Sequence, residues 1–130
     1  MRITDLLKKE SIDLNGVVTT KKETIEKMTL LMEKGGNVKD LEKYRAGVFA
    51  REEEGTTGIG EGIAIPHAKT DAVSGPGLAA MIIRDGVDYD SLDGEPVHMV
   101  FLIAAPNTED NIHLEVLSRL SMLLMDDNFR

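Results

Sequence analysis

Two apolar runs, residues 78–83 and residues 97–105, limit most strongly what this chain can fold into. Each run is short and is bounded by Gly, Pro or Asp, which are the residues that commonly end strands. Continuous apolar runs of this length are typical of strands that are covered on both faces of a sheet. We therefore expect both runs to be core strands.

Helical patterns surround these runs. Thr20 and Glu23 form a capping-box pattern, which is followed by apolar residues at helical spacing and by a stop at Gly35. A second helix is predicted over residues 39–54, where four apolar positions share one face: Leu41, Tyr44, Val48 and Phe49. A third is predicted over residues 109–125. Helices that alternate with buried strands indicate an α/β domain with a sheet between helical layers.

Turns are expected where polar residues and glycine separate the elements. The pair Asp85-Gly86 and the segment over residues 91–94 both have the composition of turns. The chain has 130 residues, which is a usual size for one domain, and it shows no internal repeat or linker. We therefore predict a single domain.

Composition excludes several classes of function. The formal net charge of −8 would repel a nucleic-acid backbone, so we expect no nucleic-acid partner. The absence of cysteine excludes disulfides, thiolate metal sites and cysteine nucleophiles in this chain. No apolar stretch approaches the roughly 20 residues of a membrane-spanning helix, and the first ten residues carry charges that a signal peptide would lack. We expect a soluble, cytoplasmic protein.

The segment over residues 52–68 is the most unusual part of the sequence. It contains four glycines within eight residues, at positions 55, 58, 60 and 62, and glycine lets a backbone approach a ligand or a neighbour closely. The short apolar run over residues 63–65 then reaches Pro66, which has no N–H for strand pairing and has a fixed φ. We expect His67 to lie at a rigid strand exit, which suits a nucleophile.

A histidine that accepts a phosphoryl group needs one neutral ring nitrogen free for attack and a hydrogen bond that holds the other nitrogen. The phosphorylated form needs donors, and the nearby candidates are the Arg51 guanidinium, the hydroxyls of Thr56 and Thr57, and glycine N–H groups. The alternative is an ordinary half-buried histidine after a strand, with a glycine-rich loop before it. The local pattern leaves both interpretations open.

Other candidate residues are less specific. His98 lies within an apolar strand without a motif, which favours an ordinary histidine at a strand end. A calcium loop starting at Asp88 would need an oxygen ligand at its twelfth position, which is Met99. The three histidines lack the short ligand spacing of a zinc site. We expect neither a metal nor another cofactor.

One pattern is specific enough to compare with a known family. Glu52, six residues, Ile59-Gly60, two residues and then Ile-Ala-Ile-Pro-His-Ala over residues 63–68 resemble the phosphohistidine signature of fructose–mannitol-type enzyme IIA domains. These domains belong to the bacterial sugar phosphotransferase system. The resemblance implies one enzyme IIA domain over residues 1–130, with a mixed β-sheet flanked by helices on both sides. It also implies a further C-terminal helix, which we expect this chain to lack.

The resemblance also implies a function. His67 would accept a phosphoryl group from the phosphohistidine of HPr and pass it to a cysteine of enzyme IIB, for coupling to sugar uptake. Because this chain has no cysteine, that acceptor would lie on another domain or protein, fused to or docked on a membrane permease, enzyme IIC. His113 would be the second active-site histidine, and Arg51 and Glu61 would line the site.

Each of these residues has a plainer interpretation. His113 falls in the first turn of the helix predicted over residues 109–125, on its apolar face, where a neutral imidazole is favoured. It could equally be a histidine at the edge of the core. Arg51 could be a cation at a helix C-terminus, and Glu61 a loop carboxylate without a task. The hydroxyls in the glycine-rich loop could simply satisfy their own backbone.

Two other functions compete with transport. A regulatory protein could use the same histidine, its phosphorylation state controlling the binding of a partner. A metal-dependent hydrolase is disfavoured, because the sequence shows no set of metal ligands. For a carrier that docks two partners in turn, we expect the histidine in a shallow depression ringed by apolar residues such as Ile59 and Ile63.

Overall fold

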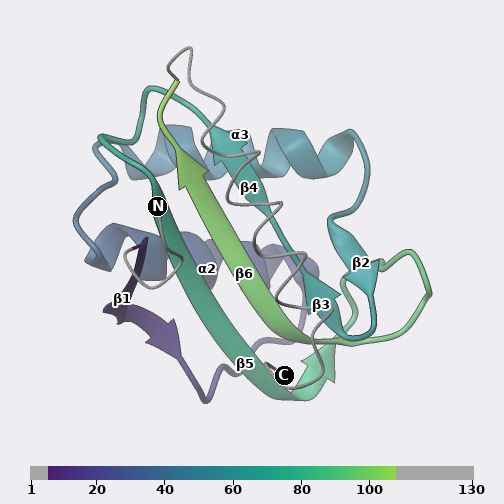
Figure 1. The fold of residues 1–130 in the computed structure, drawn as a ribbon. Helices are drawn as coiled ribbons and strands as arrows, with labels where there is room; N and C mark the ends of the chain where they lie inside the picture. The colour runs from purple at the N-terminus through teal and green to yellow at the C-terminus, as the bar shows by residue number, and fades with distance from the viewer. Residues whose placement is uncertain (1–5, 108–130) are drawn as a thin grey trace.

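The computed structural model describes residues 6–107, in which two helices accompany six strands (Figure 1). In chain order the elements are β1 (Leu7–Asp13), α2 (Lys21–Lys34), α3 (Leu41–Glu53), β2 (Gly58–Gly60), β3 (Ile63–Ala64), β4 (His67–Lys69), β5 (Gly77–Val87) and β6 (Val97–Ala105). The helix that the sequence predicts over residues 109–125 lies outside the described residues.

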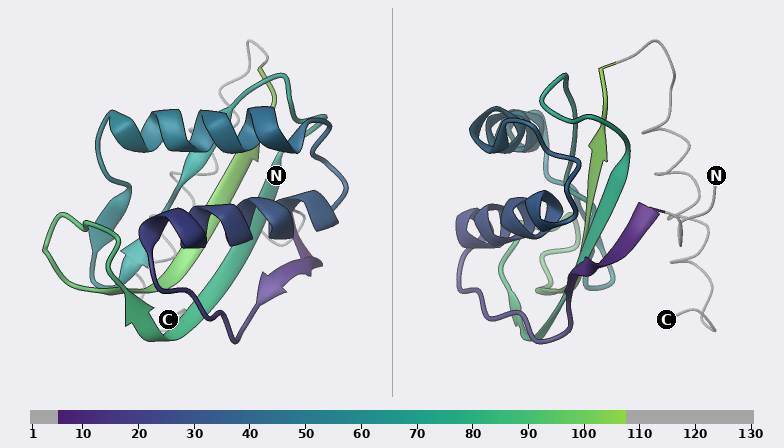
Figure 2. Two further views of the ribbon diagram at one scale, coloured as in Figure 1. Left: turned by 180° about the vertical axis from the view of Figure 1, so that it is seen from behind. Right: turned by 90° about the vertical axis from the view of Figure 1, so that its left-hand side faces the viewer.

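The strands form one mixed sheet in the order β1-β5-β6-β3-β2, and β4 also pairs with β6. β5 and β6 run antiparallel, whereas β3 and β4 both run parallel to β6. Both α2 and α3 lie against one face of this sheet (Figure 2). The predicted α/β fold with a mixed sheet is therefore confirmed.

β6 is the central strand of the sheet and is buried on both faces. Its residues Val100, Leu102 and Ala104 pack in the cluster that includes α2 and α3, whereas Phe101 and Ile103 pack in a second cluster on the opposite face. This alternation follows from the two-residue period of a strand. The prediction of a core strand over residues 97–105 is confirmed.

α2 begins and ends where the sequence predicts. Thr20 is the N-cap, and its hydroxyl oxygen accepts a hydrogen bond from the N–H of Glu23 at 3.0 Å. The Glu23 carboxylate accepts from the N–H of Thr19 at 2.8 Å, one residue earlier than in the predicted capping box. The C-cap is Gly35.

α3 is anchored to the sheet beside β4, the strand that begins at His67. Tyr44 and Val48 are fully buried, and the Tyr44 hydroxyl donates to the Ile103 carbonyl of β6 at 3.0 Å. Burial raises the pKa of Tyr44 well above its usual value, so the phenol keeps the proton that it donates. A side chain at Gly47 would crowd Ala68 of β4 at 3.3 Å, so the glycine permits close packing. α3 is thereby held against β4 and β6.

Two sheet features differ from the predictions. β5 continues past residue 83 to Val87, and the turn predicted at Asp85-Gly86 is wrong. These residues instead lie in an irregularity of the β5–β6 pairing, where Gly86 has a φ of +76°. Glycine tolerates this conformation, so the strand bulges there and does not turn. β1 was not predicted, because most of its side chains are exposed and show no clear alternation.

Candidate functional site

β3 and β4 lie in line along one side of β6 and are interrupted at Ile65-Pro66. His67 pairs with Ile103, so the strand resumes immediately after the proline, and the expectation that pairing ends there is wrong. Pro66 still contributes its carbonyl, which accepts from the N–H of Ile103 at 3.0 Å. The proline therefore interrupts the strand without releasing it from β6, and His67 begins β4 on a backbone held by β6.

The imidazole of His67 is fixed by its own strand. Its Nδ1 lies 3.0 Å from the carbonyl oxygen of Ile65, and the ring is partly exposed. A carbonyl oxygen only accepts hydrogen bonds, so Nδ1 must carry the proton. In the neutral ring the lone pair is then on Nε2, which is the nitrogen left available for chemistry.

A hollow of about 360 Å³ opens beside this ring at the edge of the sheet. The end of α3 and strand β4 line it, with seven residues: Gly47, Ala50, Arg51, Glu54, His67, Ala68 and Lys69. The structure thus brings Arg51 to the same hollow as His67, as the sequence predicts for two site residues. An open hollow of this size has room for a small charged group beside the ring.

Arg51 also has a structural contact. Its Nη1 donates to the Gly55 carbonyl at 2.9 Å, beyond the end of α3, as expected for a cation at a helix C-terminus. The guanidinium has further N–H groups that can bind an anion while this contact is kept. Both interpretations of Arg51 therefore remain compatible with its position.

Lys69 is a second cation in the hollow that the sequence reasoning missed. Residues two apart on a strand point to the same face, so Lys69 lies on the His67 side of β4, and its side chain is exposed. Strand alternation applied to residues 67–69 would have identified it. The hollow thus combines one imidazole with two cationic side chains and the Glu54 carboxylate.

Glu61 lies in the tight turn between β2 and β3. It has a φ of +56° between Gly60 and Gly62, which also have positive φ, and its N–H donates to Asp93 Oδ2 at 2.9 Å. The N–H groups of Glu61 and Glu95 lower the pKa of the Asp93 carboxyl. Among the described residues, those that line the His67 hollow do not include Glu61.

The two threonines proposed as hydrogen-bond donors to a phosphoryl group face inward. The Thr57 hydroxyl donates to the Glu52 carboxylate, and the Thr56 hydroxyl donates to the Tyr89 carbonyl at 3.2 Å. Thr57 is only 4% exposed. The Thr56 hydroxyl also accepts from the N–H of Gly58 at 3.1 Å, so it satisfies backbone of its own loop, as in the plainer interpretation. The Thr57 hydroxyl instead binds a carboxylate.

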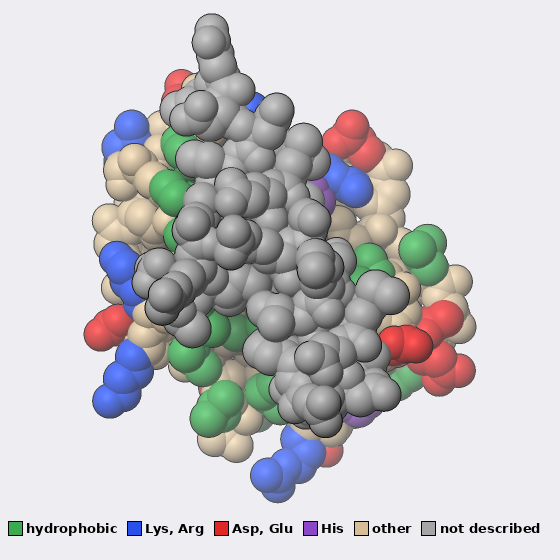
Figure 3. All heavy atoms as spheres, viewed as in Figure 1, with side chains coloured by type: hydrophobic (Ala, Val, Ile, Leu, Met, Phe, Trp, Pro, Cys, Tyr) green, Lys and Arg blue, Asp and Glu red, His purple; other side chains and the backbone are tan. Residues whose placement is uncertain are grey.

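The expected apolar ring is only partly present. Ile59 on β2 is 47% exposed, whereas Ile63 is 4% exposed and belongs to the core, so its assignment to the surface is wrong. Ile63 is buried because its side chain packs with Phe101 and Ile103 in the second core cluster. Leu92 is another exposed apolar side chain, and hydrophobic side chains lie beside acidic ones on the β2 side of the molecule (Figure 3).

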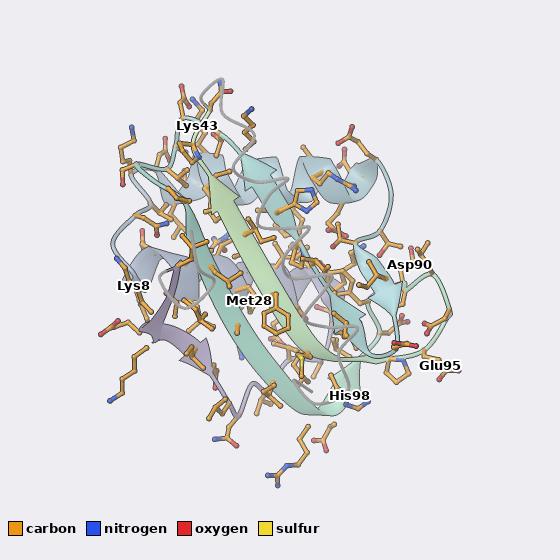
Figure 4. All side chains as sticks on the ribbon, in the orientation of Figure 1. Lys8, Met28, Lys43, Asp90, Glu95 and His98 are labelled. Atoms are coloured by element: carbon orange, nitrogen blue, oxygen red, sulfur yellow. The ribbon has the colours of Figure 1, made fainter. Side chains whose placement is uncertain are left out.

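The other histidines have different positions. His113 lies outside the described residues. His98 is exposed near the start of β6, at the end of that strand that is far from Lys43 of α3 (Figure 4). Its Nδ1 lies 3.1 Å from the Ile83 carbonyl oxygen.

Within residues 6–107, no group of three or more His, Cys, Asp or Glu side chains is arranged to hold a metal ion. None of the helices in that range combines the length and the apolar character needed to span a bilayer.

A family model described as the EIIA 2 component of the phosphoenolpyruvate-dependent sugar phosphotransferase system matches residues 5–130. A fructose-specific EIIABC component of this system from Bacillus subtilis is 49% identical over 130 residues. That match covers 100% of this chain and 20% of the relative, so the chain spans about a fifth of the relative's length.

Solved structures agree with the sequence matches. A nitrogen regulatory protein IIA-Ntr from Neisseria meningitidis is similar with a TM-score of 0.88 and 33% identity, over 97% of this chain and 86% of that one. The enzyme IIA of mannitol from Escherichia coli, in complex with phosphorylated enzyme IIB, is similar with a TM-score of 0.80 and 30% identity. This second match covers 95% of this chain and 85% of that one.

Proposed function

Because the chain belongs to the EIIA 2 family of the phosphoenolpyruvate-dependent sugar phosphotransferase system, we propose that it carries a phosphoryl group on His67 between two protein partners. The observation that carries this proposal is the 3.0 Å contact between His67 Nδ1 and the Ile65 carbonyl at the wall of a cationic hollow. This contact leaves Nε2 as the nucleophile. Family membership supports the reaction, and the contact at Nδ1 supports Nε2 as the attacking atom.

In the first transfer, the lone pair of His67 Nε2 attacks the phosphorus of a phosphohistidine on the donor. The new Nε2–P bond forms as the donor's P–N bond breaks, and the bonding pair returns to the donor's ring nitrogen. Nδ1 keeps its proton and its bond to the Ile65 carbonyl. The ring then carries a positive charge beside the anionic phosphoryl group.

In the second transfer, the retained proton makes the ring a good leaving group. When the acceptor's nucleophile attacks phosphorus, the P–Nε2 bond breaks and its electron pair returns to a ring that becomes neutral imidazole. Arg51 and Lys69 are placed to bind the phosphoryl oxygens, since charge-assisted hydrogen bonds to phosphate are the strongest available to side chains.

We assign the donor as HPr and the acceptor as a cysteine of an enzyme IIB. The Escherichia coli mannitol enzyme IIA is seen in complex with phosphorylated enzyme IIB, and the Bacillus subtilis relative is an EIIABC component. Since this chain has no cysteine, transfer leads to another domain or protein, fused to or docked on a permease. Such exchange takes place in the cytoplasm.

Two further roles follow from the family resemblance. His113 acts as the second histidine of the site and donates a hydrogen bond to the phosphoryl group. Glu61, which does not line the hollow among the described residues, orients a histidine ring of the site. Both are tested by substitution, and a transfer rate that is unchanged in His113→Ala would remove that residue from the site.

The direct experiment is to incubate the protein with enzyme I, HPr and phosphoenolpyruvate. We expect one phosphoryl group per chain, through an acid-labile and base-stable bond. Nitrogen-15 and phosphorus-31 NMR should place it on Nε2 of His67. A label on Ser, Thr or Asp, or on Nδ1, would contradict the proposal.

A regulatory role is the second candidate, and the similarity to the Neisseria meningitidis nitrogen regulatory protein favours it. The two functions differ in where the phosphoryl group goes. Radiolabelled protein is mixed with each enzyme IIB of the source organism, and the label is followed. Movement of the label to an enzyme IIB cysteine supports transport, whereas retention with all of them favours regulation.

A further inference from the structure

A buried polar cluster lies under the start of the glycine-rich segment. We name its four members, Lys21, Glu52, Thr57 and Tyr89, the Glu52 cluster. They come from the start of α2, the end of α3, the loop before β2 and the loop after β5. Glu52 is 9% exposed, Thr57 is 4% exposed and Tyr89 is fully buried. Buried polar groups are kept in a core only when they are satisfied, so their partners matter.

Glu52 is bound through both carboxylate oxygens. Oε1 accepts from the N–H of Thr57 at 3.1 Å and forms an ion pair with Lys21 Nζ at 3.0 Å. Oε2 accepts from the hydroxyl of Thr57. One carboxylate therefore holds the backbone and the side chain of the same loop residue.

The remaining groups complete the cluster. The Tyr89 hydroxyl lies 3.5 Å from Thr57 Oγ1, and because that hydroxyl donates to Glu52, Tyr89 is the donor in this contact. Burial, followed by the charge of Glu52, raises the pKa of Tyr89, so the phenol keeps its proton. The Lys21 ammonium lies 4.7 Å above the centre of the Tyr89 ring. Each charge in the cluster thus has a partner.

The cluster connects to His67 through two backbone contacts. The carbonyl of Thr57 accepts from the N–H of Ile65 at 3.0 Å. The carbonyl of the same Ile65 is the group that accepts from Nδ1 of His67. The position of Thr57 therefore helps to set the position of the oxygen that selects the tautomer of His67.

From this chain of contacts we propose that Glu52 and Thr57 are positioning residues for His67, which fix the Ile65 carbonyl and so keep the attacking lone pair on Nε2. The inference rests on the proposed function of His67. A buried ion pair and its hydrogen bonds contribute little net stability compared with apolar packing, so a cluster of this kind is better explained by the geometry that it enforces. Neither residue is among those that line the hollow beside His67.

Thr57→Val is the main test, because it removes the hydroxyl at nearly constant shape. Thr57→Ser keeps the hydroxyl and serves as the rescue. Thr29→Val is the matched control, since the Thr29 hydroxyl is fully buried and accepts from Arg45 Nε at 2.9 Å in the contact between α2 and α3. All three variants remove or keep one buried hydroxyl that has a side-chain partner.

Two readouts are measured for each variant. Nitrogen-15 NMR of the unphosphorylated protein reports the tautomer of His67, and transfer from phosphorylated HPr reports the rate. Thr57→Val should populate the Nε2–H tautomer and slow transfer on the order of ten-fold to a hundred-fold, as a displacement near 1 Å does elsewhere. Thr57→Ser should restore both readouts, and Thr29→Val should change neither.

Lys21→Met is a milder second variant in case Thr57→Val does not fold. It removes the cation beside Glu52 from a partly exposed position and should shift the tautomer and the rate in the same direction. A parent-like tautomer and rate in both variants would overturn the positioning role. Failure of the unsubstituted protein to accept phosphate on His67 would instead overturn the proposed function, while the tautomer measurement would still decide the positioning claim.

Discussion

His67 and His98 make the same kind of hydrogen bond in different surroundings. Each places Nδ1 on a backbone carbonyl, at 3.0 Å from the oxygen of Ile65 for His67 and at 3.1 Å from the oxygen of Ile83 for His98. By the same argument, both neutral rings leave the lone pair on Nε2. A fixed tautomer is therefore common to both histidines and cannot by itself define a phosphorylation site.

The surroundings of the two rings separate them. His67 opens on a hollow that Arg51 and Lys69 also line. The ring of His98 instead lies close to Gly86 and Pro96, where a side chain on Gly86 would meet its Cε1 at 2.9 Å. The comparison indicates that cationic side chains around a fixed ring, and not the fixed ring alone, make the candidate site.

The largest expected effect comes from removing each ring in turn. His67→Ala should accept no phosphoryl group from HPr, because the attacking nitrogen is gone, whereas His98→Ala should be phosphorylated to the same extent as the parent. Mass spectrometry of the intact protein at neutral pH measures both, with circular dichroism to confirm folding. Phosphorylation that requires His98 would contradict the conclusion that only the surroundings of His67 make a phosphorylation site.

A smaller effect should follow from removing one cation of the hollow. Lys69→Met should slow transfer by about ten-fold, less than the loss of a fully buried oxyanion donor, because the side chain is exposed and its charge is screened. Stopped-flow transfer from phosphorylated HPr at low salt measures the rate.

Two variants control this measurement. Lys69→Arg keeps the cation and should retain most of the rate. Lys22→Met removes an equal charge from the exposed start of α2, away from the hollow, and should leave the rate unchanged. Equal slowing in Lys69→Met and Lys22→Met would indicate a general effect of net charge and would remove Lys69 from the site.

Local patterns predicted those parts of the fold whose residues interact along the chain. Helix α2 follows from its cap at Thr20 and its stop at Gly35, and β6 follows from a continuous apolar run. His67 was identified from its signature, and Lys69 could have been found from strand alternation. These features depend on neighbours within a few residues.

Contacts between distant parts of the chain could not be predicted in this way. Glu52 meets Lys21 and lies in one cluster with Tyr89, residues that only the folded sheet and helices bring together. The bulge at Gly86 depends on the register of β5 against β6. Spacing in the sequence carries no information about such partners, so their roles became visible only in three dimensions.

Gly86→Ala tests the packing around the His98 ring. Gly86 has a φ of +76°, and an added side chain would lie 2.9 Å from His98 Cε1. We expect a loss of about 1–3 kcal/mol in the free energy of unfolding, from the strained conformation and the crowded ring. Urea unfolding measures it, and His67 in the folded variant should still accept phosphate.

Gly94→Ala is the matched control, since Gly94 has a φ of +74° but open space where a side chain would be added. The difference between the two variants isolates the crowding at His98. Equal destabilisation would mean that the His98 ring moves away freely. The contact between Gly86 and His98 would then contribute nothing to the free energy of unfolding.

The smallest effect concerns pH at the same end of the sheet. The N–H groups of Glu61 and Glu95 lower the pKa of Asp93, so the folded protein favours the carboxylate more than the unfolded chain does. This contribution is fully present above the unfolded pKa of about 3.9 and is lost as the pH falls through the lower folded value. Because Glu61 precedes Gly62, whose carbonyl accepts from the N–H of His98 at 2.8 Å, protonation of Asp93 should loosen the His98 end of the sheet first.

NMR titration should show the Glu61 amide shifting below about pH 4 while the His67–Ile65 contact persists, and Asp93→Asn should abolish that titration. A Glu61 amide that does not respond would contradict the effect of Asp93 on this turn, whereas a simultaneous change at His67 would show that the two ends of the sheet are not independent.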